Sequence, residues 1–202
     1  MLMDETDCGA PRIAALRGAP SSAMQALLDE FAQRRASAGL RVAGVVEDSD
    51  CAHDGARKHF RVRDLLSGET ISISQDLGRG STACNLDPAA LVRACGRIET
   101  AISEGADLVV LSKFGKLEAA RSGLADAFRA AIEADLPILT VVSPAAAEEW
   151  ELFAAPLFQF LDANLEALEG WWEQQAPQRA LWSEEDAEDS AGRSLASCET
   201  AQ

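Results

Sequence analysis

Residues 13–46 read I-A-A-L-R-G-A-P-S-S-A-M-Q-A-L-L-D-E-F-A-Q-R-R-A-S-A-G-L-R-V-A-G-V-V, and this stretch decides the fold. It opens with a short apolar run at 13–16 that predicts a buried strand, followed by a loop at 18–22. Apolar residues then recur at helical spacing up to Gly39, and the valine-rich run at 40–46 predicts a second buried strand. A strand, a loop, a helix and a strand in this order are typical of a parallel α/β sheet.

The rest of the chain continues this alternation after an inserted hairpin. Residues 60–65 and 69–74 alternate apolar and polar side chains around Ser67-Gly68, which predicts a β-hairpin. Asp87-Pro88 is a good helix start, because an N-cap acid accepts a hydrogen bond from a free amide and proline suits the first turn. The remaining expected elements are a strand at 107–111, a helix to about 134, a strand at 137–142, and helices at 145–153 and 156–172. The predicted fold class is α/β, a mainly parallel sheet with flanking helices and an inserted β-hairpin.

Length and composition favour one domain with flexible ends. A chain of 202 residues can bury a substantial core but is short for two domains. No apolar signal region opens the chain, and no apolar run approaches the ~20 residues that cross a bilayer, so we expect a cytoplasmic protein. Ten acidic and two basic residues lie in 162–202. We therefore expect a flexible N-terminus at 1–9, one domain at 10–174 and an acidic disordered tail at 175–202.

The charge and the metal-binding side chains exclude several partners. A net charge of −15 with no basic stripe makes nucleic acid and anionic membranes poor ligands, whereas a small anion responds only to the local field. The five cysteines form no C-x-x-C pair, and His53 and His59 have no third partner pattern. The sequence therefore predicts neither a disulfide framework nor a transition-metal cation site, and it leaves homo-oligomer formation open.

The loop at 18–22 follows the first strand, where a parallel α/β sheet binds its ligands. A phosphate-binding loop reads G-x-x-x-x-G-K-[ST], with glycines whose amides wrap phosphates and a lysine that neutralises them. Only Gly18 survives, because Ala23-Met24-Gln25 match neither the lysine nor the hydroxyl. A helix N-terminus with Ser21 and Ser22 still favours an anion, although either serine could instead simply cap the helix.

A second candidate loop, at 112–118, follows the strand expected at 107–111. In P-loop NTPases this strand ends in an acid that holds Mg²⁺, often with a second acid that polarises water. Ser112-Lys113 stand at this point, and a lysine cannot bind Mg²⁺ but can neutralise an oxyanion. The candidate ligand-binding residues are Lys113, Gly115 and Lys116. The alternative is that both lysines are solvated surface charges.

A third candidate loop lies between the hairpin and the helix that starts at Asp87. Two glycines, a base, two hydroxyls and a run of amides suit an anion-binding nest, and an ordinary connecting loop explains them equally well. Cys84 is a candidate ligand or reactive thiol, whereas a buried structural cysteine is the commoner case. The candidate ligand-binding residues of this loop are Gln75, Asp76, Gly78, Arg79, Gly80, Ser81, Thr82 and Cys84.

Residues 44–73 and 108–118 resemble a family of small nucleoside-triphosphatases first described in thermophiles and linked to cancer in humans. That family has a P-loop, a strand with a G-F-x-x-x-E-like end, a hairpin with G-F-x-x-x-D-L-x-x-G, and a D-E-I-G-x-M-E loop. Ser112-Lys113 stand where the family has its two acids. The residues that keep their places are Gly115, Lys116 and Glu118. The resemblance spans about 11–142 and implies a degenerate P-loop-NTPase-like fold.

The chain is similar in more detail to an uncharacterised bacterial domain family with the patterns I-S-Q-D-L-G-x-G-S-x-x-C-x-L-D and K-F-G-K-x-E. Residues 73–87 and 113–118 fit these patterns nearly letter for letter. Genes of that family often lie beside molybdate-transport genes, which implies a role in molybdenum metabolism by association. The resemblance favours the three loops as one ligand site.

Three hypotheses for the function follow. The first is a non-hydrolysing oxyanion-binding protein that binds, stores or delivers molybdate, because a tetrahedral dianion suits helix-terminal amides, hydroxyls and lysines without Mg²⁺. The second is a nucleoside-triphosphatase or nucleotide-binding protein with displaced catalytic groups, in which Asp76, Asp87 or Glu118 holds the metal. We favour the first, with no catalytic residues and with molybdate, or otherwise a nucleotide, as the ligand.

The third hypothesis is a pseudo-NTPase subunit that binds a partner protein. Its contact surface would be the tail and the region of Trp150, Trp171 and Trp172, although aromatic residues near a chain end are more often part of the core. Magnesium-dependent phosphate release separates the second hypothesis from the others, and stabilisation by molybdate separates the first from the third.

Overall fold

The computed structural model describes residues 11–48, 60–74 and 86–175 of the 202-residue chain. The chain divides into two compact units, of which Pro11–Leu168 is the first, and residues 169–175 are the described part of the second. The sheet, its flanking helices and the candidate site all belong to the first unit. Within the described residues, no helix is long and apolar enough to cross a membrane.

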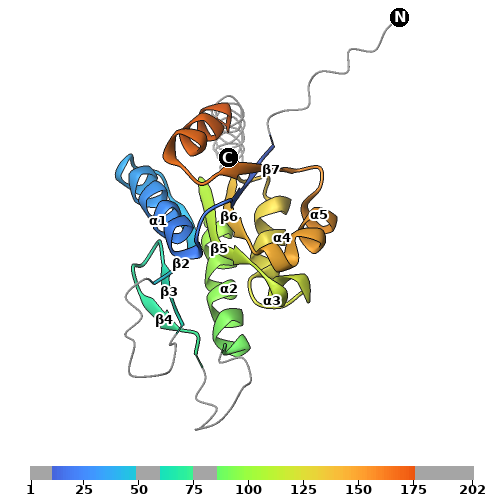
Figure 1. The fold of residues 1–202 in the computed structure, drawn as a ribbon. Helices are drawn as coiled ribbons and strands as arrows, with labels where there is room; N and C mark the ends of the chain where they lie inside the picture. Colours follow the sequence, from blue (N-terminus) through green and yellow to red (C-terminus); the bar gives the residue numbers. More distant parts are fainter. Residues whose placement is uncertain (1–10, 49–59, 75–85, 176–202) are drawn as a thin grey trace, which may run out of the picture. The chain divides into compact units, whose positions relative to one another are not determined.

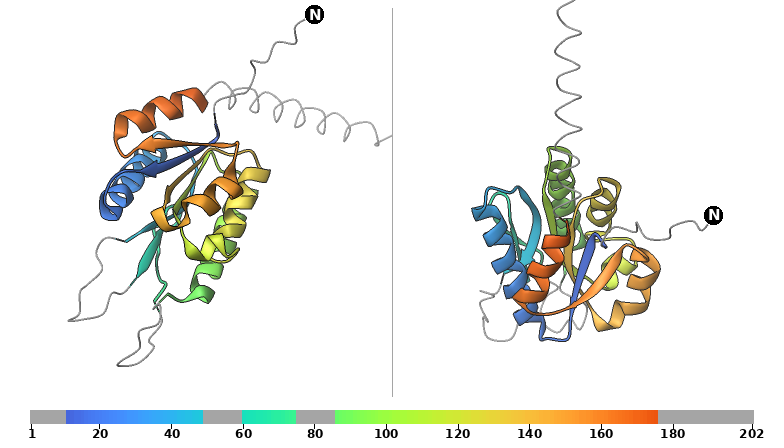
Figure 2. Two further views of the ribbon diagram at one scale, coloured as in Figure 1. Left: turned by 45° about the vertical axis from the view of Figure 1, so that its right-hand side comes forward. Right: turned by 90° about the horizontal axis from the view of Figure 1, so that it is seen from above.

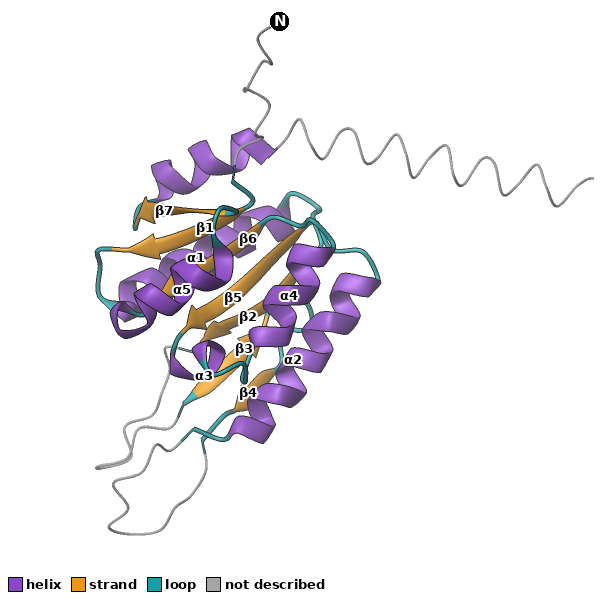
Figure 3. Ribbon diagram, turned by 90° about the vertical axis from the view of Figure 1, so that its right-hand side faces the viewer, coloured by secondary structure: helices purple, strands orange, loops and turns teal. Residues whose placement is uncertain are grey.

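A seven-stranded sheet forms the centre of the first unit, in the order β4-β3-β2-β5-β6-β1-β7 (Figure 1, Figure 3). Strands β2, β5, β6, β1 and β7 are parallel, and β3 and β4 add the antiparallel hairpin beside β2. The bounds are β1 (Ile13–Arg17), β2 (Val42–Glu47), β3 (Arg61–Asp64), β4 (Thr70–Ser72), β5 (Leu108–Phe114), β6 (Ile138–Val142) and β7 (Phe158–Asp162).

Helices cover both faces of this sheet (Figure 1, Figure 2). Helix α1 packs against β2, β5 and β6 on one face, whereas α2 and α4 pack against each other on the opposite face. Helix α5 joins the second group, because the ring of its Trp150 contacts Phe128 of α4. The bounds are α1 (Ser21–Ser37), α2 (Pro88–Ser103), α3 (Lys116–Ala119), α4 (Ala125–Glu133), the 3₁₀ helix η1 (Pro144–Ala146) and α5 (Ala147–Ala154).

The sheet has a switch point between β1 and β6. The connection from β1 leads through α1 to β2, and the connection from β6 leads through α5 to β7, on the other side of β1. The two connections therefore leave neighbouring strands toward opposite faces. Ligands of parallel α/β sheets bind at such points, and the loop after β1 lies there.

Local sequence signals located the hairpin and the start of α2. The carboxylate of Asp64 accepts hydrogen bonds from the amides of Leu66 (3.0 Å) and Ser67 (2.8 Å), which closes the turn between β3 and β4. The Asp87 carboxylate accepts a hydrogen bond of 2.9 Å from the Ala89 amide at the N-terminus of α2. Both predictions are confirmed.

The expected helix at 156–172 is wrong in its first part. Residues Phe158–Asp162 are strand β7, which pairs in parallel with all five residues of β1, and a helix begins only at residue 165. The physical reason is the alternation of Phe158 and Phe160 with polar Gln159, which suits a strand, together with the free edge of β1 that this backbone can pair with.

Two further boundaries differ from expectation. Strand β5 runs three residues beyond Leu111, to Phe114, because the fully buried Phe114 ring packs against Phe128 and Trp150. Ser112 and Lys113 thus belong to the strand and not to the following loop. The helix expected to reach about 134 is divided into α3 and α4 by a turn in which Gly123 has a φ of +63°.

Candidate functional site

The candidate site lies at the carboxyl ends of the parallel strands, beside the N-terminus of α1. The structure describes Gly18, Ser21, Ser22, Lys113, Gly115 and Lys116 among the predicted ligand-binding residues. The predicted residues that lie outside the described part of the chain are Gln75, Asp76, Gly78, Arg79, Gly80, Ser81, Thr82 and Cys84.

The loop after β1 turns through Gly18, whose φ of +86° lies in the region that glycine adopts most easily. Ser21 and Ser22 are exposed and form the first turn of α1. The N-cap is Pro20, with no side-chain hydrogen bond, so neither serine caps the helix. The first turn carries no acidic residue, and its leading amides have no partner inside the helix. This arrangement favours an anion.

The two residues at the lysine and hydroxyl positions of a phosphate loop are buried. Met24 is 6% exposed and Gln25 is 1% exposed. The Gln25 amide nitrogen donates a hydrogen bond of 2.6 Å to the Ser112 carbonyl on β5, and its oxygen accepts one of 2.9 Å from the Glu47 amide on β2. Gln25 therefore connects α1 to two strand ends, and sequence reasoning missed this role.

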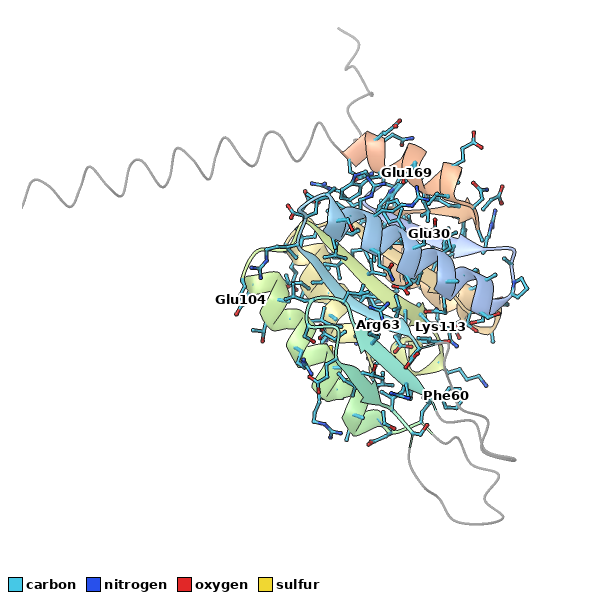
Figure 4. All side chains as sticks on the ribbon, turned by 90° about the vertical axis from the view of Figure 1, so that its left-hand side faces the viewer. Glu30, Phe60, Arg63, Glu104, Lys113 and Glu169 are labelled. Carbon is cyan, nitrogen blue, oxygen red and sulfur yellow. The ribbon has the colours of Figure 1, made fainter. Side chains whose placement is uncertain are left out.

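Lys113 extends from β5 toward the end of β2. Its ammonium lies 3.4 Å from the carboxylate of Glu47, and both side chains are partly exposed, at 42% and 36%. Figure 4 shows Lys113 and Arg63 beside α1, to which Arg63 is tied by an ion pair with Asp29. Lys113 is thus not simply a solvated charge, because a carboxylate partly neutralises it.

The loop after β5 is held by Glu118. The Glu118 carboxylate accepts hydrogen bonds from the amides of Gly115 (3.0 Å) and Leu124 (3.1 Å), and the residue is 8% exposed. Gly115 is buried beside this carboxylate, whereas Lys116 is exposed on α3. Among the described candidate residues Lys113, Gly115 and Lys116, only Lys116 therefore has an exposed charge with no carboxylate beside it.

The acids suggested as displaced metal ligands have other partners. Glu118 holds two backbone amides, and Asp87 caps α2 and lies 4.0 Å from Arg93. Asp76 lies outside the described residues. Across residues 11–48, 60–74 and 86–175, no three His, Cys, Asp or Glu side chains gather as a metal site.

Mg²⁺ is the cation that the P-loop fold implies, and the residues present do not fit it. P-loop NTPases hold Mg²⁺ with a Ser or Thr hydroxyl of the loop and an acid on a neighbouring strand. Here the hydroxyl position is Gln25, whose amide nitrogen and oxygen each bond to a strand backbone, and the two acid positions are Ser112, which carries no charge, and Lys113, which is a cation itself.

A separate cleft of about 570 Å³ lies between α2 and the hairpin turn, away from these strand ends. Arg97 spans it, 2.8 Å from Glu69 and 3.6 Å from Asp64. The Glu69 hydrogen bond, followed by the Asp64 charge, raises the pKa of Arg97. Each charged side chain that lines this cleft thus has an ion-pair partner.

The tryptophans proposed as a contact surface are buried. Trp150 is 0%, Trp171 1% and Trp172 6% exposed. Trp150 packs in an aromatic cluster with Phe114, Phe128, Phe153 and Phe158. Trp150 therefore belongs to the core of the first unit.

Comparison with known proteins agrees with this fold. Residues 13–171 match the family described as "Protein of unknown function (DUF2478)". The solved structure of THEP1 from the hyperthermophile Aquifex aeolicus superposes with a TM-score of 0.52 at 14% identity, covering 76% of this chain and 90% of that chain. The mixed α/β fold of this chain is therefore similar to that of THEP1.

Two characterised relatives are similar in sequence. Over 172 residues, the chain is 36% identical to the molybdenum import ATP-binding protein ModC 2 of Bradyrhizobium diazoefficiens, a match that covers 85% of this chain and 19% of the relative's length. It is 26% identical over 133 residues to the nucleoside-triphosphatase THEP1 of Methanosarcina acetivorans, which covers 63% of this chain and 74% of that protein.

Proposed function

This chain belongs to the DUF2478 family of proteins of unknown function, and we propose that it is a non-hydrolysing oxyanion-binding protein of the cytoplasm that handles molybdate. The fold supplies a nucleotide-binding framework, and the site keeps one feature of that framework that binds anions, the helix N-terminus that follows β1. It lacks the features that position Mg²⁺ and water for hydrolysis.

The observation that carries the proposal is the charge pattern at the strand ends. An α1 N-terminus without acidic residues lies on the same sheet edge as an ammonium, Lys113, at a strand end where P-loop NTPases carry an acid. Backbone amides and an ammonium attract a dianion, and Ser21 and Ser22 add hydroxyl donors. No group of this set needs a metal ion to act.

Molybdate is the ligand we favour because it is a tetrahedral dianion of suitable size for a few amides and one ammonium. The similarity to a molybdenum import ATP-binding protein supports the same ligand, although that relative is much longer than this chain. A nucleotide is the second candidate, and the THEP1-like fold and sequence favour it.

Calorimetry on the full chain tests the proposal, with molybdate, tungstate, sulfate, phosphate, ATP and GTP as ligands. A hydrogen bond to a charged group contributes roughly 1.5–3 kcal/mol, so Lys113→Ala should weaken molybdate binding by about ten- to a hundredfold. Lys116→Ala should have a smaller effect. Arg129→Ala is the control, because Arg129 carries one exposed positive charge on α4 and is not among the predicted ligand-binding residues.

Two results would contradict the proposal. One is that no tetrahedral oxyanion binds below millimolar concentration. The other is that Lys113→Ala binds molybdate as tightly as the parent chain does. Binding of ATP or GTP in preference to all oxyanions would favour the nucleotide candidate instead.

A further inference from the structure

Two residues of the site replace both protein ligands that the P-loop fold uses for a divalent cation. In that fold the cation is held between a hydroxyl at the loop and an acid at a neighbouring strand end. Gln25 stands at the first position, and the pair Ser112-Lys113, of which Lys113 carries the charge, stands at the second. The side-chain contacts of these two residues show what has taken the place of the metal ligands.

Both polar atoms of the Gln25 side chain already have backbone partners. Its amide nitrogen donates to the Ser112 carbonyl at 2.6 Å, and its amide oxygen accepts from the Glu47 amide at 2.9 Å. At 1% exposure the side chain is also closed to solvent. Mg²⁺ demands near-ideal octahedral geometry and keeps several waters, so this sealed position does not suit it.

Lys113 supplies a positive charge beside Glu47, the residue whose backbone amide bonds to Gln25. Its ammonium lies 3.4 Å from Glu47, the carboxylate at the end of β2. A divalent cation that approached Glu47 would be repelled by this ammonium, because two like charges a few ångströms apart repel each other. The carboxylate that could attract a metal is therefore already paired.

We propose that the Gln25 amide and the Lys113 ammonium together replace the divalent cation, so that the site binds its oxyanion in the absence of any metal ion. Lys113 is the permanent positive charge opposite the oxyanion. Gln25, on α1, fills the position of the metal-binding hydroxyl and bonds to the ends of β5 and β2. This inference rests on the proposed function for the identity of the ligand, but its central claim concerns the cation and can be tested without that ligand.

The first test measures Mn²⁺ binding, as a probe for Mg²⁺, by electron paramagnetic resonance on the full chain. Lys113→Asp should bind one Mn²⁺ at least about tenfold more tightly than Arg129→Asp, a change of about 1.4 kcal/mol. Arg129→Asp is the matched control, because it alters the net charge of this acidic chain by the same amount at an exposed site. The double variant Gln25→Thr/Lys113→Asp should bind still more tightly.

The single variant keeps the test decisive if the double variant fails to fold, because Lys113 is partly exposed and Gln25 is not. Equal Mn²⁺ affinity in Lys113→Asp and Arg129→Asp would overturn the inference. So would one tightly bound Mn²⁺ in the unaltered chain that Glu47→Gln removes.

The second test compares molybdate binding in buffer with EDTA and in buffer with Mg²⁺. Equal affinity in the two buffers supports the inference. Binding only with Mg²⁺ overturns it and leaves the proposed function intact. Absence of binding in both buffers overturns the proposed function, and the Mn²⁺ comparison then decides the present inference alone.

Discussion

The side chain of Gln25 on α1 donates a hydrogen bond of 2.6 Å to the backbone carbonyl of Ser112 on β5. Gln25→Ala would leave that carbonyl and the Glu47 amide without this partner. A buried polar group left unpaired costs about 1–3 kcal/mol, so we expect the free energy of unfolding to decrease by about 2–4 kcal/mol. Urea denaturation of the full chain measures this change.

Gln33 offers the matched control on the same helix. It is exposed, and its side chain bonds only to Asp29 one turn away. Gln33→Ala should change stability by no more than about 0.5 kcal/mol. Equal effects of the two substitutions would show that the Gln25 bridge contributes nothing special to stability.

Glu118 serves the backbone of its own loop, and we expect its loss to affect folding and not metal binding. Glu118→Ala leaves the buried amides of Gly115 and Leu124 unpaired, which should cost about 2–5 kcal/mol. Mn²⁺ affinity should stay at the value of the parent chain. Glu133→Ala, which removes an exposed acid of α4, controls for charge. A selective loss of metal binding in Glu118→Ala would restore Glu118 as a ligand.

The backbone of Gly44 on β2 lies so close to the backbone of Val110 on β5 that no side chain fits between them. It has a φ of +123°, and an added Cβ would lie 1.8 Å from the Val110 carbonyl oxygen on β5. Gly44→Ala should therefore destabilise the protein by more than about 3 kcal/mol or prevent folding. Thermal unfolding and the soluble yield measure this effect.

Gly96 is the contrasting position. It lies on the exposed side of α2, and an added Cβ meets nothing within 4 Å. Gly96→Ala should stabilise the helix by roughly 0.5–1 kcal/mol. Similar effects at Gly44 and Gly96 would contradict the close approach between β2 and β5.

The parts of the fold that could be predicted from sequence depend on local signals. The hairpin turn at Asp64 and the cap at Asp87 form through hydrogen bonds to residues two or three positions away. Strand β7 could not be located in this way, because its pairing partner β1 lies far back along the chain. Its five residues follow Pro156 and precede a true helix, so the helical interpretation extended too far.

The sequence indicated which positions to consider as a candidate site, but it did not indicate the contacts that the side chains there make. Lys113 was singled out because an acid was expected there, but its pairing with Glu47 spans 66 residues of sequence. Gln25 looked like an ordinary residue of an amphipathic helix. Its partners are backbone groups 22 and 87 residues away, and nothing in a single sequence marks such partners.

Cys95 should be an inert thiol in the folded chain. Its sulfur accepts a hydrogen bond from the Ala127 amide at 3.2 Å, and burial raises the pKa of the thiol from 9.0 to about 11. The thiolate fraction at pH 8 is then about a hundredfold lower than for a free cysteine. With the other four cysteines changed to serine, alkylation by iodoacetamide should be slower than in urea by at least that factor.

The same pKa shift has a consequence for stability. Because the folded-state pKa lies above the unfolded value, the contribution of Cys95 to the free energy of unfolding is complete below pH 9 and decreases as the pH rises toward 11. Cys95→Ala should remove this part of the pH dependence. An alkylation rate that is the same with and without urea would show that the thiol is open to solvent.

The last prediction concerns hydrolysis of nucleotides, which we expect to be negligible. Charge neutralisation and metal positioning supply most of the catalysis of phosphoryl transfer. Met24 replaces the lysine, Gln25 replaces the hydroxyl, and Ser112-Lys113 replace the two acids, so each of the required groups is absent from its position. Phosphate release from ATP or GTP with Mg²⁺ should stay far below the order of 1 s⁻¹ that working enzymes reach. Turnover at that rate that Asp76→Asn abolishes would show that displaced groups had taken over the reaction.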